Sequence, residues 1–265
     1  MIRALYKLVL GLPSFRGRHR LDGALRGLLQ PPVDMVDGLK MELDPLEWTQ
    51  IEFLSGKLPE TQTLALIRNL LNPGDVCIDI GAHVGLHALV AAQAVGPTGQ
   101  VLALDPQPYN CDRLLNNAAL NGFNHILVLA AAAGDQDGFV VLHNQKRNDK
   151  TRLTLAGAGV SDAATRFETP VMKLDTLAAR HNIHAVDLIK IDVEGYEHEV
   201  LRGGAGVLAV TRNVIFESLP ETGKSMVQET AGVLIGLGFT LRQIDGSPWE
   251  PGQTSIDNNV WAARD

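Results

Sequence analysis

Hydrophobic and polar positions follow two alternating patterns from residue 75 to the end of the chain. Short apolar runs, such as 76–80, alternate with longer segments in which apolar residues recur at helical spacing, such as 85–95. The apolar runs predict strands buried on both faces, and the longer segments predict helices. The predicted strands are 76–80, 100–104, 126–130, 187–191, 214–217, 239–244 and 259–263, and the predicted helices are 85–95, 109–121, 174–181, 197–208 and 222–237.

This alternation predicts the fold class, which is an α/β protein with a doubly wound, mostly parallel, Rossmann-like sheet. Only residues 245–258 separate the last two predicted strands. A connection that short carries no helix, and strands joined without a crossover helix are usually antiparallel. The last strand is therefore expected to be antiparallel to the others.

Two further segments lie outside the alternating core pattern, one before the core elements and one between them. Residues 31–72 predict an extension packed on the core: it begins with a β-hairpin that has Asp37 and Gly38 in its turn, and it ends with a helix over 61–71. Residues 143–166 are polar, contain glycine and follow a short predicted strand. We expect this second segment to be a mobile lid over a ligand site, because long loops between core elements often carry function.

Residues 1–30 form a basic arm with six Lys or Arg residues and one Asp. Its apolar positions fall on one helical face and predict a helix packed on the domain. A weak contact with a membrane surface or a protein partner is the alternative, because basic amphipathic helices favour anionic surfaces. A disordered tail is a further alternative.

Composition and charge exclude several classes of function. The net charge of −7 argues against nucleic acid as a partner, because phosphate binding needs a basic surface. Cys77 and Cys111 have the spacing of neither a metal site nor a disulfide framework, which favours a reducing compartment. No stretch reaches the ~18 apolar residues of a membrane span, and residues 1–12 are a poor signal peptide. We therefore expect a cytoplasmic protein.

The strongest chemical signal is the run from Asp79 to Gly85, where a predicted strand enters a glycine turn that opens a helix. This arrangement is typical of a nucleotide site at the carboxyl ends of parallel strands. Gly81 is expected to let a ligand approach the backbone, and Gly85 to let the helix pack on the strand. Asp105 ends the next strand, where an acid can accept hydrogen bonds from both ribose hydroxyls.

The spacing of the two glycines indicates which nucleotide binds. A dinucleotide site needs a further glycine where the pyrophosphate meets the helix, and this chain has His83 and Val84 there. S-adenosylmethionine has no phosphate, and its ammonium group favours an acid beside the turn, which Asp79 supplies. We therefore predict S-adenosylmethionine as the cofactor. Asp135, after the third strand, is the candidate partner of the adenine amino group, although it could equally be an ordinary turn residue.

The segment from Lys190 to Gly195 closely resembles the Lys-Ile-Asp-Val-Glu-Gly signature of the FkbM-type methyltransferase family. The glycine turn resembles the family's first motif, which usually has Asn where this chain has His83. Asp105 and Pro106 resemble its acid–proline pair, which is more often Glu-Pro. The resemblance covers about residues 35–263. It implies an S-adenosylmethionine-dependent methyltransferase domain over 73–265 and, usually, methylation of a hydroxyl on a sugar, polyketide or other small metabolite.

Methyl transfer to a hydroxyl requires the acceptor oxygen to lie about 3 Å from the methyl carbon and a base to take its proton. The candidate catalytic bases are Glu194, Glu217 and His83, in that order, because they lie near the strand ends where the methyl group should point. Glu194 could instead be a structural acid that binds backbone amides at a helix N-terminus. Asp192 is assigned to the cofactor end of the site or to ordering Lys190.

Several alternatives stay open at this point. A divalent ion held by Asp192, Glu194 and Glu217 is one, although no metal is predicted and no His/Cys cluster supports zinc. A non-catalytic binding protein with this fold is another, but it would not need the acids beside the glycine turn. A nicotinamide-dependent oxidoreductase is the third. His87, one turn into the helix, is expected to be a packing residue.

Overall fold

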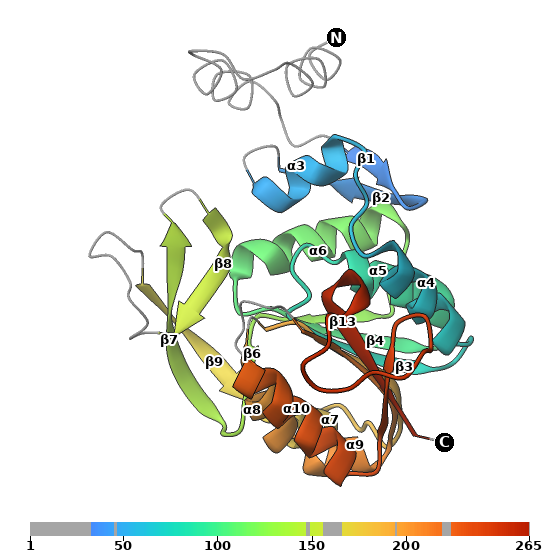
Figure 1. The fold of residues 1–265 in the computed structure, drawn as a ribbon. Helices are drawn as coiled ribbons and strands as arrows, with labels where there is room; N and C mark the ends of the chain where they lie inside the picture. The colour runs from blue at the N-terminus through green and yellow to red at the C-terminus, as the bar shows by residue number, and fades with distance from the viewer. Residues whose placement is uncertain are drawn as a thin grey trace, which may run out of the picture.

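The computed structural model describes residues 33–44, 47–146, 149–155, 166–193, 195–218 and 224–264. A seven-stranded sheet forms its centre, with the strand order β12-β13-β11-β10-β3-β4-β5 (Figure 1). All pairs are parallel except those that involve β13, which confirms the predicted fold class and the antiparallel last strand. The strands are β3 (Val76–Ile80), β4 (Gln100–Leu104), β5 (Ile126–Leu129), β10 (Val186–Ile191), β11 (Thr211–Glu217), β12 (Thr240–Gln243) and β13 (Asn259–Ala263).

Helices cover both faces of this sheet, and successive residues of each strand contribute to opposite layers. Cys77 and Leu188 pack in one hydrophobic cluster with α4 (Thr61–Leu70), α5 (Leu86–Val95) and α6 (Pro108–Leu120). Ile78 and Ile189 pack in the other cluster, with α7 (Leu174–Arg180), α8 (Glu197–Arg202), α9 (Ala205–Ala209) and α10 (Lys224–Gly236). Both faces are therefore buried, which explains the continuous apolar runs of the strands. Among the described helices, none is long and apolar enough to cross a membrane.

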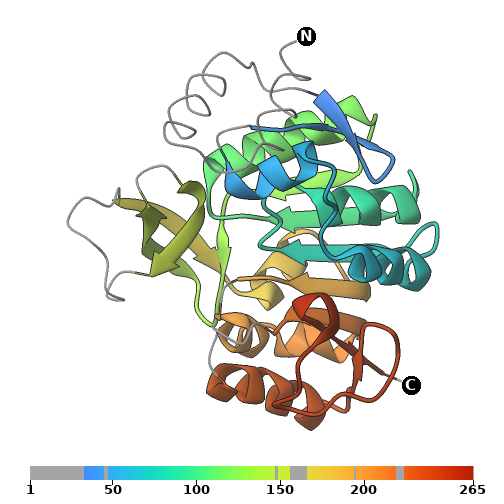
Figure 2. The same ribbon diagram turned by 45° about the horizontal axis from the view of Figure 1, so that its top comes forward.

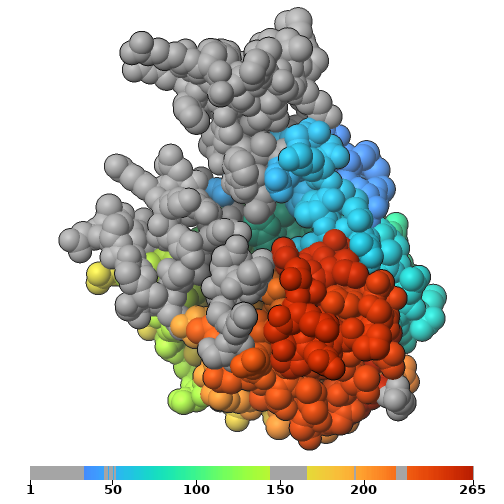
Figure 3. All heavy atoms as spheres, in the orientation of Figure 1, coloured from blue at the N-terminus to red at the C-terminus, as the bar shows by residue number. Residues whose placement is uncertain are grey.

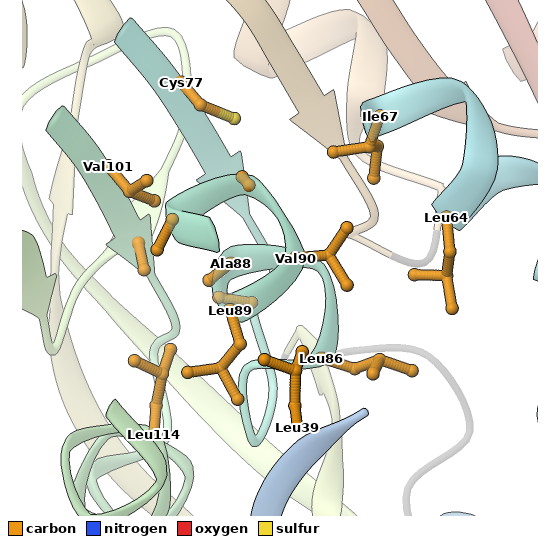
Figure 4. Close-up of a cluster of buried hydrophobic side chains, with 14 of the residues drawn as sticks. Leu39, Leu64, Ile67, Cys77, Leu86, Ala88, Leu89, Val90, Val101 and Leu114 are labelled. Atoms are coloured by element: carbon orange, nitrogen blue, oxygen red, sulfur yellow. The ribbon is translucent and has the colours of Figure 1, made fainter. Parts of the chain in front are cut away.

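Helix α5 carries the glycine turn at its N-terminus and is buried on almost every side. Leu64 and Ile67 of α4 pack on one side of it, and Leu114 of α6 packs on the other (Figure 4). Its many alanines allow this close packing between two helices and the sheet. The position of the turn is therefore fixed by the core.

The predicted hairpin is confirmed as β1 (Val33–Val36) and β2 (Leu39–Glu42). Asp37 and Gly38 have φ values of 51° and 81°, as a two-residue turn of this hairpin type requires. Side chains of α6 fix the hairpin, since Asn117 accepts a hydrogen bond from the backbone N–H of Glu42 at 2.6 Å. The following helix, α3 (Trp48–Leu54), was not predicted. The predicted basic arm lies outside the described residues.

A second sheet, with the order β6-β9-β7-β8, stands to one side of the main body (Figures 1 and 2). It contains β6 (Ala132–Ala133), β7 (Gly138–Lys146), β8 (Asp149–Leu155) and β9 (Arg166–Met172). The prediction of a loop throughout 143–166 is therefore wrong, because the described part of that segment is mostly strand. The apolar alternation of β8 is limited to Leu153 and Leu155, so backbone pairing with β7 defines most of the strand.

The predicted single helix over 197–208 is two short helices that meet at Gly203 and Gly204. The carboxylate of Asp175 starts the second one by accepting hydrogen bonds from the backbone N–H groups of Gly206 and Val207. A Cβ atom on Gly203 would lie 2.0 Å from the carbonyl oxygen of Gly134. The turn between the helices thus packs directly on the backbone that follows β6.

We predict that Gly203→Ala lowers the free energy of unfolding by about 1–3 kcal/mol, the usual cost of overpacking a tight contact. The backbone at Gly203 is ordinary right-handed helix, so only the contact opposes the methyl group. Urea unfolding measures the effect. The matched control is Gly232→Ala in α10, where a Cβ meets nothing within 4 Å and which should stabilise by about 0.5–1 kcal/mol. Equal effects in both variants would show that the contact at Gly203 is not tight.

Candidate active site

A cavity of about 720 Å³ lies at the carboxyl ends of the central strands. It brings together residues that follow β3, β4, β5, β10 and β11, with one wall from β7. This is the edge at which ligands bind in open α/β sheets. The sequence-predicted residues that line it are Gly81, His83, Asp105, Asp135, Asp192 and Glu217.

The glycine turn is required by contacts within the protein. Gly81 has φ +81°, and a Cβ atom on it would lie 1.8 Å from the carbonyl oxygen of Asp192. Gly85 has φ +98°, and its Cβ would lie 2.7 Å from Cγ of Leu114. The structure adds a reason within the protein for each glycine. The backbone at the end of β10 fills the place of a side chain on Gly81, which itself lines the cavity, and Gly85 allows α5 to pack closely on α6 as well as on β3 and β4.

His83 occupies the left-handed region at the centre of this turn, with φ 51°. Its backbone N–H donates a hydrogen bond to Oδ2 of Asp105 at 2.9 Å. Asn, Asp and His tolerate this conformation better than most residues. This gives a physical reason why His83 stands where the resembling motif usually has Asn.

Asp105 lines the cavity and also holds the neighbouring loops through hydrogen bonds. Its Oδ1 accepts hydrogen bonds from the backbone N–H of Gln107 at 2.8 Å and from Nδ2 of Asn110 at 3.0 Å. Burial raises the pKa of Asp105 to about 6, although these donors and the N–H of His83 oppose the shift. The carboxylate thus lies at the cavity wall with its position fixed by three donors.

Asp79 lies behind the turn and does not line the cavity, since the residue is 1% exposed. Burial raises the pKa of its carboxyl, while His87 and Lys190 oppose the rise. Its Oδ2 atom is buried and has no hydrogen-bond partner among the described residues. A buried carboxylate oxygen without a donor can accept one from a bound cation such as an ammonium group.

Lys190, the penultimate residue of the buried strand β10, is opposite Asp79 on the neighbouring strand and is only 1% exposed. Its Nζ lies 3.3 Å from Oδ2 of Asp192. Burial opposes its charge, but Asp192, Glu60 and Glu217 outweigh burial and raise the pKa of Lys190. The expected link between Asp192 and Lys190 is therefore present.

Glu60 and His87 were missed as site residues by the sequence interpretation. Both line the cavity, and Oε2 of Glu60 lies 3.1 Å from Nε2 of His87. Nδ2 of Asn259 also donates a hydrogen bond to that Oε2 atom at 3.0 Å. The prediction that His87 is only a packing residue is thus wrong. The available signal was a titratable side chain in the otherwise apolar first two turns of α5.

Glu194, the first candidate for the base, lies outside the described residues. Oε1 of Glu197 accepts hydrogen bonds from the backbone N–H groups of Val193 and Gly195. Glu197 thus performs a structural task of the kind considered for Glu194, and the role of Glu194 itself stays a prediction. Within the described ranges, no three His, Cys, Asp or Glu side chains converge as metal ligands.

Residues 79–240 match the family model for the methyltransferase FkbM domain. The chain belongs to this family. The match includes the glycine turn, the acids Asp79 and Asp105, and the segment around Lys190. It makes this FkbM-family protein an S-adenosylmethionine-dependent methyltransferase, as the sequence predicted.

Several relatives carry names that describe their reactions. The 2-O-methyltransferase NoeI of Sinorhizobium fredii is 26% identical, covering 63% of this chain and 74% of that protein. The 31-O-demethyl-FK506 methyltransferase FkbM of Streptomyces tacrolimicus is 28% identical, covering 64% of this chain and 75% of that protein. The hexuronic acid methyltransferase AglP of Haloferax volcanii is 24% identical, covering 60% of this chain and 62% of that protein.

The side chains of this FkbM-family protein fit S-adenosylmethionine. Asp105 can accept from ribose hydroxyls, and the exposed Asp135 at the cavity wall suits an adenine amino group, while the carboxyl group of Asp79 behind the turn suits an ammonium group electrostatically. The cavity is within the usual range for sites that enclose a small molecule. These individual residue roles are proposals, which the experiments below address.

We predict that Asp105 makes the protein less stable as pH rises. Its pKa is about 6 in the folded state against 3.8 ordinarily, so the folded state holds the proton longer and the free energy of unfolding falls between these values. The total loss is about 3 kcal/mol, from two pKa units at about 1.4 kcal/mol each. The measurement is urea unfolding of the wild type and Asp105→Asn at several pH values.

The difference in stability between the wild type and Asp105→Asn should shrink or reverse as pH rises from about 4 to about 7. Asp112→Asn, at an exposed position of α6, is the control and should show no comparable change. A difference that stays constant over this range would mean that burial does not perturb Asp105.

Proposed function

We propose that this protein transfers the methyl group of S-adenosylmethionine to a hydroxyl group of a small metabolite, such as a sugar or a polyketide. The observation that carries the proposal is one continuous cavity that joins the cofactor-binding turn to a wall of exposed apolar and aromatic side chains. When bound, the cofactor supplies an electrophilic methyl group on a sulfonium sulfur. The protein must place an acceptor oxygen about 3 Å from that carbon.

Three aromatic side chains on that wall support a sugar or polyketide as acceptor. Phe139 of β7 is 70% exposed and Tyr196 is 41% exposed, although both line the cavity. Phe53 of α3 lines it as well. Aromatic faces pack well against the C–H surfaces of a sugar ring or a polyketide chain. The names of the relatives add support, since two specify an oxygen and one specifies a hexuronic acid.

On this proposal Asp105 holds the ribose, Asp135 the adenine amino group and Asp79 the ammonium group. Gly81, Gly85 and His83 shape the turn that positions them, and Asp192 orders the region where the methyl group would lie. Glu217 and His83 stay candidates for the base because both line the cavity. Two free, buried thiols, Cys77 and Cys111, support the proposed cytoplasmic location.

Two alternative functions predict different ligand binding or different activity at the cavity. A nicotinamide-dependent oxidoreductase would place a pyrophosphate at the start of α5, where His83 and Val84 crowd the backbone. A non-catalytic binding protein would bind the cofactor without transferring its methyl group. Ligand binding separates the first rival from the proposal, and an assay of transfer separates the second.

We predict that S-adenosylhomocysteine raises the melting temperature and that NAD does not, because a ligand specific for the native state stabilises it. Asp105→Ala should weaken S-adenosylhomocysteine binding by about 1.5–3 kcal/mol, the scale of a hydrogen bond to a charged group. Titration calorimetry measures the affinity, with Asp112→Ala as the control. Stabilisation by NAD alone would falsify the methyltransferase assignment, and unchanged affinity in folded Asp105→Ala would place the ribose elsewhere.

We also predict that methyl transfer goes to oxygen. The protein is incubated with ¹³C-methyl-labelled S-adenosylmethionine and neutral methyl glycosides, a glucuronoside, glucosamine and a small-molecule extract of the cells that make it. A methoxy signal in the NMR spectrum is the expected product. An N-methyl signal would contradict the choice of oxygen. Cofactor binding without any labelled product would favour the binding-protein alternative.

A further inference from the structure

The ion pair between Glu60 and His87 lies on the side of the cavity away from the proposed adenosine site. Asp105 follows β4 and Asp135 follows β5, towards one edge of the sheet. Glu60 is bonded to Asn259 of β13, which lies beyond β11 towards the opposite edge. The ion pair is thus placed at the end of the cavity where the acceptor, and not the adenosine, would bind.

The backbone of Glu60 is strained at this position. It has φ 52° and ψ 38°, a left-handed conformation that is unfavourable for a residue with a long side chain. Glu60 precedes α4 but makes no capping hydrogen bond with its side chain. Strain that the surrounding structure maintains is frequently associated with a functional site.

The C-terminal segment performs the capping task in place of Glu60. Oδ2 of Asp257 accepts hydrogen bonds from the backbone N–H groups of Gln62 at 2.8 Å and Thr63 at 3.0 Å. In the space-filling view, this C-terminal segment (red) lies against the segment that contains α4 (cyan) (Figure 3). The carboxylate of Glu60 is therefore left to bind His87 and Asn259.

We propose that His87 is the base that accepts the proton of the acceptor hydroxyl, and that Glu60 is the positioning residue that orients its ring. The acting form of His87 is the neutral ring with its proton on Nε2, which lies 3.1 Å from Oε2 of Glu60, so Nδ1 is the nitrogen that takes the hydroxyl proton. As the hydroxyl oxygen bonds to the methyl carbon, the methyl–sulfur bond breaks and its electron pair stays on sulfur. The products are a methyl ether, S-adenosylhomocysteine and an imidazolium ion. This inference rests on the proposed O-methylation.

Two neighbouring carboxylates, those of Glu60 and Asp192, are poorly suited to be the base. Burial opposes ionisation of Glu60, but His87, Lys190 and Asn259 outweigh it and lower the pKa of Glu60 to about 2. Asp192 is paired with the Lys190 ammonium group. A base of very low pKa, or one already paired with a cation, accepts a hydroxyl proton poorly.

His87 has the opposite electrostatic environment. Burial and Lys190 of β10 lower the pKa of His87, but Glu60, which precedes α4, and Asp79 of β3 outweigh them and raise it above 6.5. A base is most effective when its pKa is close to the working pH. The side chain is 16% exposed, and it lines the cavity. Both the position of His87 at the cavity and its raised pKa therefore suit the role of a base.

The test begins with His87→Gln, which keeps a polar side chain beside Glu60 but removes the base. With an acceptor that the wild type methylates, kcat should fall by about 10²–10⁴-fold, the usual contribution of a general base. The dissociation constant of S-adenosylhomocysteine should change by less than about threefold, because the pair lies on the side of the cavity away from the proposed adenosine contacts. His184→Gln, at an exposed position, is the matched control.

The pH profile separates a catalytic role from a structural one. In the wild type, kcat/KM should fall as the pH drops below the pKa of His87, which lies above 6.5. This fall at low pH, the acid limb of the profile, should be absent in His87→Gln. In Glu60→Gln the limb should move to lower pH, because the carboxylate that raises the pKa of His87 is gone. NMR titration of the histidine ring carbons should show the same shift without any acceptor.

Three results would overturn the proposal. One is an acid limb that persists in His87→Gln, and another is an S-adenosylhomocysteine affinity that falls in step with kcat, which would assign the ion pair to the cofactor. The third is a His87 titration that is the same in wild type and Glu60→Gln. If the wild type itself methylates no oxygen, the proposed function has failed, and so has the role of His87 as its base. The NMR titration would then still show whether the ion pair exists.

Discussion

The buried ammonium group of Lys190 is the constraint on which the site depends. A lysine in a strand covered on both faces must find negative partners, because an uncompensated buried charge is very costly. Here Asp192, Glu60, Glu217 and Asp79 all contribute to keeping it charged. Those acids come from three neighbouring strands and from the start of α4, so one charge organises most of the groups at the carboxyl edge of the sheet.

A second constraint is the close approach of backbones around the glycine turn. Gly81 lies against the carbonyl group of Asp192, and the N–H of Asp192 donates to the carbonyl of Ile80 at 2.9 Å. Asp105 holds the far side of the turn through the N–H of His83. The loop after β3 is thus fixed between β4 and β10 by hydrogen bonds and by the absence of a side chain. Such a preorganised turn suits a site that must hold a reactive group within a fraction of an ångström.

Much of this could be predicted from the sequence, because the signals were local. Apolar runs marked the central strands, Asp37 and Gly38 marked the hairpin, and the short 245–258 connection marked the antiparallel last strand. The predicted cofactor acids also reach the cavity or lie directly behind it. What local patterns could not give were contacts between distant segments. The hydrogen bond from Asn259 to Glu60 joins residues 199 positions apart, so the sequence near Glu60 could not predict this contact.

The errors have the same origin. Residues 149–155 contain only two alternating apolar residues, Leu153 and Leu155, and pairing with β7 completes the strand. The break between α8 and α9 depends on the contact of Gly203 with the backbone of Gly134, which no helical pattern contains. His87 looked like a packing residue because its neighbours in α5 are buried and apolar. In each case a tertiary contact overrode a reasonable local interpretation.

The charges around the cavity connect these constraints to the reaction. Its described lining residues include seven acids, Glu52, Glu60, Asp105, Asp135, Asp192, Glu199 and Glu217, and neither Lys nor Arg. An acidic, partly enclosed surface attracts cations and strengthens their interactions as water is excluded. The sulfonium of the cofactor is positive, whereas the sulfur of the product is neutral. A field of this sign favours the charged cofactor over the product with its neutral sulfur.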